Sequence, residues 1–103
     1  MNIYQDVRVV PNQKYSVSGR LLIERMNNAG FYVAIHYFDQ NYRLVGADTP
    51  AYVNKSIDWT RLHGQFNPPE EAAIVRVHFH LMEQGDNGSG KVYVTNTRLK
   101  RMN

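Results

Sequence analysis

The sequence predicts an all-β fold, a β-sandwich or β-barrel, formed by a single domain over residues 1–103. Hydrophobic residues alternate with polar ones at a period of two in several separate segments, which is typical of strands with one buried face. These segments are short, and turns rich in Pro, Asn and Gly separate them. No segment has a convincing helical period, and 103 residues are enough for one modest core.

The first half of the chain contains three expected strands. An alternating strand covers residues 3–9, a turn follows at residues 11–14, and a second alternating strand covers residues 15–23. The segment ERMNNAG, residues 24–30, is expected to be a loop. The segment FYVAIHYF, residues 31–38, is apolar on both faces, which predicts a central strand.

The second half begins with a turn and an irregular segment, residues 46–54. Three further strands follow, at residues 59–66, 73–82 and 91–99. Trp59 opens the first of these strands, and we expect it to pack in the core because Trp is seldom exposed in a small domain. Six strands joined by short turns fit either a sandwich or a barrel.

The charge of the chain is mildly positive, with twelve Lys and Arg residues against nine Asp and Glu residues. Most basic residues are scattered, which argues against a nucleic-acid partner. Only Arg98, Lys100 and Arg101 cluster, and we expect them to form a solvated C-terminal tail. Binding of a nucleic-acid strand through basic and aromatic residues stays an open but less favoured alternative.

Cysteine and long apolar segments are both missing from the sequence. The lack of cysteine excludes disulfides, thiolate metal sites and cysteine nucleophiles. No apolar run approaches the roughly 20 residues needed to cross a bilayer. The N-terminal stretch MNIYQDVRVVPNQ lacks the apolar core of a signal peptide. We therefore expect no membrane partner, and an excised domain of a secreted protein would look the same.

A glycine-rich stretch, GDNGSGK at residues 85–91, has almost the spacing of a phosphate-binding P-loop. Val92 stands where the motif requires Ser or Thr to hold magnesium. A P-loop must also open a helix, whereas the following KVYV is β-branched and strand-like. The stretch is therefore predicted to be a hairpin loop.

Histidines at alternate positions suggest a metal site of cupin type. His78, His80, Glu83 and Gly90 resemble the first cupin motif, but the gap before Glu83 is one residue too short and no histidine follows His80. His78 and His80 could still join His36 around zinc, copper, nickel or iron. We favour two histidines on a polar strand face and expect no metal, with the metal site as an alternative.

Catalysis has little support in the sequence. The acidic residues fall in or beside expected loops, and no two of them form an evident acid/base pair, although loops could bring two together in space. There is no G-x-S-x-G nucleophile elbow. We expect that the protein is not an enzyme.

Five segments in a fixed order carry a resemblance to a known family. They include QDVRV, YSVSG, YFDQN, a long segment that begins DWTRLHGQFNPP, and GSGKVYVTNTRL: residues 5–9, 15–19, 37–41, 58–77 and 88–99. Together they resemble the jelly-roll carbohydrate-binding modules of the galactose-binding-like superfamily. The resemblance covers most of the 103 residues.

This resemblance implies a jelly-roll sandwich of two antiparallel sheets that binds a glycan without cleaving it, in an extracellular or virion-associated protein. Members of the family commonly have additional strands before the position of Ile3, so we expect an exposed edge strand that could pair with a second copy. Many relatives hold a structural calcium. Thr95 and Asn96 occupy the matching C-terminal region here, which argues against calcium, and no cofactor is expected.

The candidate carbohydrate-binding residues lie on two strands. Sugars require aromatic faces for their C–H surfaces and planar polar groups for their hydroxyls. The even-numbered positions supply both, which gives the predicted site: Tyr32, His36, Arg76, His78 and His80. A loop that covers the first strand, or a convex solvated face on the second, would remove this site. The remaining alternative is a structural or assembly β-sandwich of a phage or cell-surface protein.

Overall fold

The computed structural model describes residues 2–83 and 88–102, which form seven strands and no helix. Within this part of the chain no helix is long and apolar enough to cross a membrane. The strands are β1 (Asn2–Arg8), β2 (Lys14–Asn27), β3 (Ala29–Phe38), β4 (Leu44–Val53), β5 (Ile57–Phe66), β6 (Ile74–Glu83) and β7 (Ser89–Met102).

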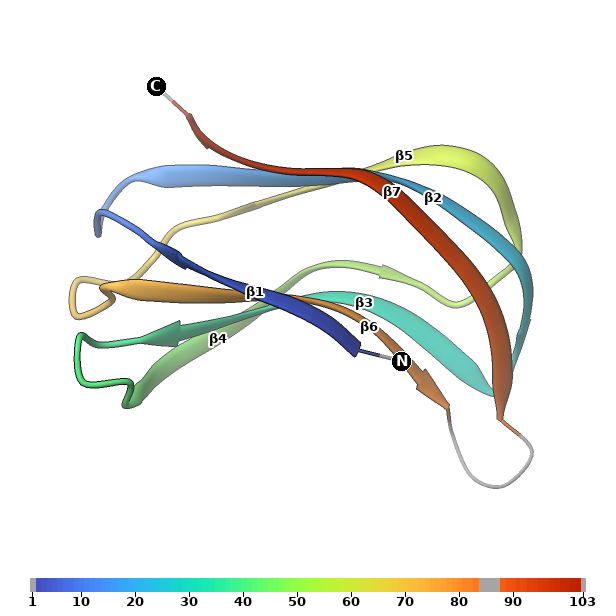
Figure 1. Ribbon diagram of the computed structural model, residues 1–103, viewed down its shortest axis with the longest axis horizontal. Coiled ribbons are helices and arrows are strands. Elements are labelled where there is room, and N and C mark those ends of the chain that lie inside the picture. The colour runs from blue at the N-terminus through green and yellow to red at the C-terminus, as the bar shows by residue number, and fades with distance from the viewer. Residues whose placement is uncertain (1, 84–87, 103) are drawn as a thin grey trace.

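The strands form two sheets that lie face to face (Figure 1). One sheet has four strands in the order β1-β6-β3-β4, and the other has three in the order β5-β2-β7. All hydrogen-bonded neighbours are antiparallel. The predicted all-β antiparallel sandwich is confirmed, as two sheets and not as a closed barrel. β3 lies between β6 and β4, which confirms the predicted central strand.

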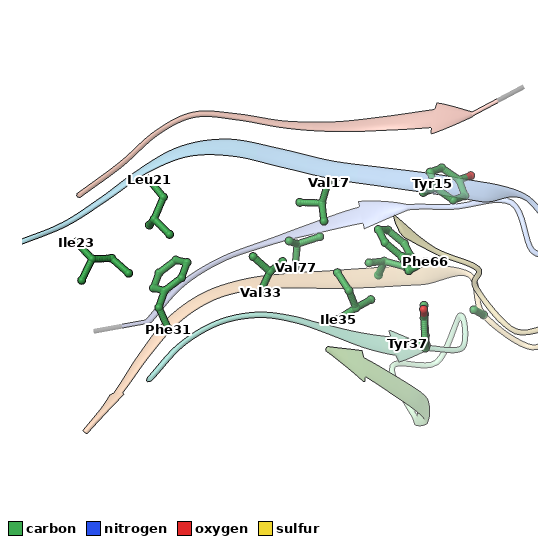
Figure 2. Packing of buried hydrophobic residues seen from close by; sticks show 12 residues of the cluster. Tyr15, Val17, Leu21, Ile23, Phe31, Val33, Ile35, Tyr37, Phe66 and Val77 are labelled. Atoms are coloured by element: carbon green, nitrogen blue, oxygen red, sulfur yellow. The ribbon is translucent and has the colours of Figure 1, made fainter. Parts of the chain in front are cut away.

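The core lies between the inner faces of the two sheets. In β3 the odd-numbered residues Phe31, Val33 and Ile35 are buried, while the even-numbered residues from Tyr32 to Phe38 are partly exposed. Leu21 and Ile23 of β2 face them across the sandwich (Figure 2). Burial of a side chain of this size stabilises the fold by about 1.5–3 kcal/mol relative to exposure. The central strand is thus apolar inside and semi-polar outside.

The segment at residues 24–30 is strand, so the expected loop is wrong. β2 continues to Asn27, and β3 begins at Ala29. Asn28 turns the chain between them with a φ of 46°, a left-handed conformation that Asn adopts more readily than most residues. One residue in this conformation replaces the loop that the polar composition indicates.

The segment at residues 46–54 also differs from its expected irregular structure, because most of it belongs to β4. β4 is an edge strand, and its register against β3 shifts between Val33 and Ile35. Small and polar residues in GADTPAY, together with this bulge, hide the alternation that marks the other strands.

The C-terminal basic residues Arg98, Lys100 and Arg101 are not a tail. They lie in β7, which pairs with β2 from Ser89 to Met102. Their alternation with apolar positions is weak, but the long partner strand supplies the backbone hydrogen bonds that hold them in the sheet. The expected solvated tail is therefore wrong.

Trp59 lies on the outer surface of the three-stranded sheet, so its expected place in the core is wrong. Its side chain remains 42% exposed. The register between β5 and β2 shifts between Leu21 and Ile23, which is where Trp59 stands. The guanidinium of Arg20 lies 5.4 Å from the centre of the indole ring. A cation–π contact on the surface replaces burial in the core.

Strands of both sheets bend in the same direction toward one end of the molecule, at the right of Figure 1. The outer face of the four-stranded sheet lies on the inside of this bend and is concave. The outer face of the three-stranded sheet lies on the outside and is convex. The bend follows from the twist and the bulges of the long strands. These two faces are called the concave face and the convex face below.

Strands β1 and β7 are edge strands on the same side of the sandwich. Ile3 of β1 is 59% exposed, which is typical of an unprotected edge strand. Pairing of this edge with a second copy stays a prediction.

Candidate functional site

The concave face presents the even-numbered side chains of β1, β6 and β3. Because all three strands are antiparallel and in register, these side chains form rows across the sheet. The rows are Asn2, His80 and Tyr32; then Tyr4, His78 and Ala34; then Asp6, Arg76 and His36. All five sequence-predicted site residues therefore stand on one face. No loop of the described residues covers Tyr32 and His36, since both residues are partly exposed.

A hollow of about 490 Å³ lies on this face. Four predicted residues line it: Tyr32, His36, His78 and His80. Ala34 lies between Tyr32 and His36 along β3 and opposite His78 on β6, so a small side chain leaves room at the centre. The volume falls in the usual range of small-ligand sites, about 300–1,000 Å³.

His78 is the most constrained side chain of the hollow. Its ring centroid lies 4.5 Å from that of His36, with the planes at 60°. Its Nδ1 lies 3.2 Å from the side-chain oxygen of Asn2. When Nδ1 carries the proton and donates to this oxygen, Nε2 keeps a lone pair. Nε2 is buried and has no hydrogen-bond partner among the described residues.

The environment of His78 disfavours its charged form. Burial lowers the pKa of His78 below the ordinary value of 6.5, and the positive charges of His36, Arg76 and His80 lower it further, against a smaller opposing effect of Asp6. The imidazole is therefore neutral at pH 7. A neutral ring keeps a lone pair at Nε2, but this atom is buried, so a ligand hydroxyl reaches it only when the ring turns toward the hollow.

Arg76 stands on the same face but outside the lining of the hollow. Its Nε and Nη2 donate to the two carboxylate oxygens of Asp6, at 2.7 and 3.0 Å. The same guanidinium lies 4.8 Å from the ring centre of Tyr4 and 5.0 Å from that of Phe38. The ion pair lowers the pKa of the Asp6 carboxyl. Arg76 thus connects three side chains beside the hollow and neutralises a carboxylate there.

A pair of tyrosines borders the hollow on the side of β4. The rings of Tyr32 and Tyr52 lie 4.8 Å apart at a tilt of 43°. Tyr52 can lie flat on β3 because Gly30 has no side chain: a Cβ at that position would come within 2.6 Å of Tyr52 Cε1. Gly30 therefore permits the position of an aromatic ring that is 48% exposed.

The arrangement of the histidines does not form a metal centre. Across the described residues, no group of three or more His, Cys, Asp or Glu side chains is placed to hold an ion. His36 and His78 approach each other edge to face, a packing contact of two rings. His80 faces Asn2 and Tyr32 in the neighbouring row.

Only residues 88–91 of the glycine-rich stretch at residues 85–91 are described, and none of them lines this hollow. Residues 85–87 lie outside the described residues. Ser89 begins β7, and Lys91 already pairs with Arg25 of β2. A strand, not a helix, follows the glycines, so the P-loop reading fails for the reason that the sequence indicates.

Sequence reasoning missed several residues of this face. Asn2 and Thr49 line the hollow, Tyr4 contacts His78 at 5.6 Å between ring centroids, and Tyr52 contacts Tyr32. Alternation in residues 3–9 places the side chains of Tyr4 and Ile3 on opposite faces of the strand. This pattern could have identified Tyr4 as an outward side chain. Nothing in the sequence indicates that β1 and β4 flank the strands that carry the histidines.

Comparison with known proteins identifies the fold. No family model matches the sequence, and no curated protein matches it. A CBM4 structure superposes with a TM-score of 0.69 at 17% identity, over 98% of this chain and 61% of that one. The C-terminal family 22 carbohydrate-binding module of Clostridium thermocellum Xyn10B gives 0.66 at 17% identity, over 95% of this chain and 62% of that one.

A third similar structure is the enzymatically active domain of bacteriophage CBA120 tailspike protein 4, with a TM-score of 0.75 at 13% identity, over 98% of this chain and 14% of that one. The chain thus spans less than two thirds of each of these structures. At such low identities the likeness establishes the fold alone. It is the jelly-roll sandwich of carbohydrate-binding modules, as the sequence resemblance predicts.

Proposed function

We propose that this protein is a non-catalytic carbohydrate-binding module that recognises a glycan on its concave face. The observation that carries the proposal is the hollow, which is lined by the rings of Tyr32, His36, His78 and His80. Sugar rings present apolar C–H faces and hydroxyl groups together, so they need both kinds of contact in one place. The similar fold of carbohydrate-binding modules supports the same conclusion.

Each predicted residue has a role in this proposal. Tyr32, with Tyr52 beside it, forms an aromatic platform for one face of a sugar ring. His78 lines the hollow and accepts a hydrogen bond from a sugar hydroxyl once its ring turns to expose the buried Nε2. His36 and His80 border the hollow on either side and offer further ring nitrogens.

Arg76 has a different role because Asp6 already occupies two of its donors. A guanidinium has five N–H donors, so three are left for a ligand. The side chain is 29% exposed, and its guanidinium makes cation–π contacts with the rings of Tyr4 and Phe38. We assign to it the positioning of these rings and a contact at the margin of the glycan.

The composition of the hollow supports binding without cleavage. Glycoside hydrolysis generally requires two carboxyl groups on either side of the scissile bond. The described residues that line the hollow are Asn2, Tyr32, Ala34, His36, Thr49, His78, His80 and Met82, and they include no carboxylate. Asp6, on the same face, is held by Arg76. Neither observation supports an acid/base pair.

A glycan array tests the proposal. We expect the wild-type protein to bind at least one glycan and the His78→Ala/His80→Ala double variant to bind it at least tenfold more weakly. His63→Ala/Gln65→Ala, on the convex face, is the matched control and should bind as the wild type does. Equal binding by wild type and the His78/His80 variant, with circular dichroism unchanged, would exclude this site.

A second candidate is an assembly module of a virion or cell-surface protein, with a protein partner. The tailspike likeness and the exposed edge of β1 favour it. In this case the array would give no hits, and light scattering would detect a stable oligomer. Substitution of exposed Ile3 by Lys would then dissociate that oligomer.

A further inference from the structure

The two sheets differ sharply in charge. Strands β2, β5 and β7 together contain eight Lys and Arg residues and two Asp and Glu residues. Strands β1, β3, β4 and β6 contain two basic and three acidic residues. Basic residues that are scattered in the sequence are therefore gathered by the fold on one sheet, and its convex face carries a concentrated positive potential.

Three arginines lie close together on the convex face. Arg20 of β2 is directly opposite Arg61 of β5, and Arg98 of β7 is opposite Ser18 in the neighbouring row. Opposite side chains on one face of an antiparallel pair have Cβ atoms about 4.5–5.5 Å apart, and like charges there destabilise the sheet. Ion pairs among the described residues involve Arg43, Arg76 and Lys91, and none of these three arginines.

The arginines border a hollow of about 780 Å³. Its lining is Ser18, Gly19, Arg20, Arg61, Asn96, Thr97 and Arg98. A β-bulge shapes it, because the register of β7 against β2 shifts between Ser18 and Arg20. Asn96 lies within the bulge and has a φ of 54°. Bulges of this kind are frequent beside functional sites, where they redirect side chains.

We propose that this convex hollow binds an acidic polysaccharide through its carboxylate or sulfate groups. Guanidinium groups donate paired hydrogen bonds to such anions. An anion bound between Arg20 and Arg61 removes the repulsion that the register creates between them. Hydroxyl and amide groups of Ser18, Thr97 and Asn96 lie in the same hollow and suit the neutral hydroxyls of a sugar chain.

A polysaccharide fits this face better than a nucleic acid does. Single-stranded nucleic acids bind where successive bases stack on open aromatic faces. The two exposed rings of the convex face already have cations over them: Arg20 over Trp59 at 5.4 Å, and Lys91 over Tyr93 at 5.7 Å. The arrangement provides anion contacts without a free stacking platform. This site is separate from the glycan site proposed on the concave face.

Isothermal titration calorimetry tests this inference. The intact protein is titrated with dextran sulfate, with polygalacturonate and with neutral dextran. We expect both acidic polymers to bind, with an affinity that falls as NaCl increases, and neutral dextran not to bind. The Arg20→Gln/Arg61→Gln/Arg98→Gln variant should lose at least tenfold in affinity for the acidic polymers. Its circular dichroism spectrum should match that of the wild type.

The control variant removes the same charge elsewhere: Arg8→Gln/Arg43→Gln/Lys55→Gln, all at exposed positions off the convex face. It should stay within twofold of the wild type. Equal losses in both triple variants, or full affinity in the arginine variant, would overturn the site. Tighter binding of oligo-dT or duplex DNA than of dextran sulfate, lost in the same arginine variant, would overturn the assignment to a polysaccharide. The His78→Ala/His80→Ala variant should bind dextran sulfate as the wild type does, so the two proposed sites can fail independently.

Discussion

On the concave face the single Asp–Arg pair is neutralised, since Asp6 and Arg76 bind each other, and aromatic rings surround the hollow. On the convex face Arg20 stands opposite Arg61, and neither forms an ion pair with any carboxylate of the described residues. Both faces use the outward positions of strands whose inward positions build one shared core. The period of two thus allows each outer face to carry its own chemistry without any change in the core.

A core substitution should weaken both faces together, and this is the largest effect that we expect. Phe31 is fully buried at the centre of the core. Phe31→Ala should lower the free energy of unfolding by about 3–5 kcal/mol, because it removes buried apolar surface and leaves a cavity. Urea unfolding measures the loss. Glycan and dextran sulfate binding should fall in proportion to the unfolded fraction, and loss of only one of them would contradict a shared core.

A substitution in the concave hollow should separate the two faces. Ala34→Phe fills the space between Tyr32 and His36. Glycan affinity should fall about 30-fold or more, equivalent to about 2 kcal/mol, while dextran sulfate binding stays unchanged. Gln65→Phe, on the convex face but outside its hollow, is the control for an added exposed ring. Undiminished glycan binding in the Ala34 variant would place the glycan elsewhere.

Acidification should weaken the concave face through His78. Its folded-state pKa lies below 6.5, so the unfolded chain takes up this proton first as the pH falls. His78 therefore adds no pH dependence above 6.5, and below it the free energy of unfolding decreases until the folded-state pKa is passed. Glycan affinity decreases only as the pH falls through the lower folded-state pKa, because the protonated ring has no lone pair at Nε2.

Two measurements check this pH dependence between about pH 5 and pH 8, the range in which histidines titrate. NMR titration should give a His78 pKa below 6.5. Urea unfolding should depend less on pH in His78→Phe than in the wild type. A His78 that titrates above 6.5 would contradict the burial and charge effects described here.

The smallest effect is expected at Gly30. Gly30→Ala introduces a Cβ that displaces the ring of Tyr52. The ring is at the end of an exposed side chain and can move, so the free energy of unfolding should change by less than about 1 kcal/mol. Glycan affinity should fall severalfold. In a Tyr52→Ala background the Gly30 substitution should have no further effect, and additive losses would show that it acts elsewhere.

Strand alternation predicts much of the fold, but not all of it. Buried odd positions such as Val33 and Ile35 alternate clearly with Tyr32 and His36, and β3 is predicted correctly. β4 is an edge strand with small residues and a bulge, so its pattern is weak. Trp59 is outside the core because the register of β5 shifts there, a property of the pairing and not of β5 alone.

Strand alternation also predicts part of the candidate site. Alternation within one strand places His78 and His80 on a common face. The sequence does not state that β6 lies between β1 and β3, which is what brings Tyr4 and His36 to opposite sides of His78. The sequence does not indicate the cluster of arginines on the convex face, because Arg20, Arg61 and Arg98 come from three distant segments.

The position of β6 also determines when the concave face can form during folding. β1 pairs only with β6, and Asn2 lies opposite His80, near the other end of the chain. Such a distant pairing needs the closure of a long loop, which costs entropy and slows folding. During synthesis on the ribosome, β1 cannot form its pairing until β6 has emerged. The surface that we assign to the glycan is thus completed late, when the strand that carries His78 and His80 is in place.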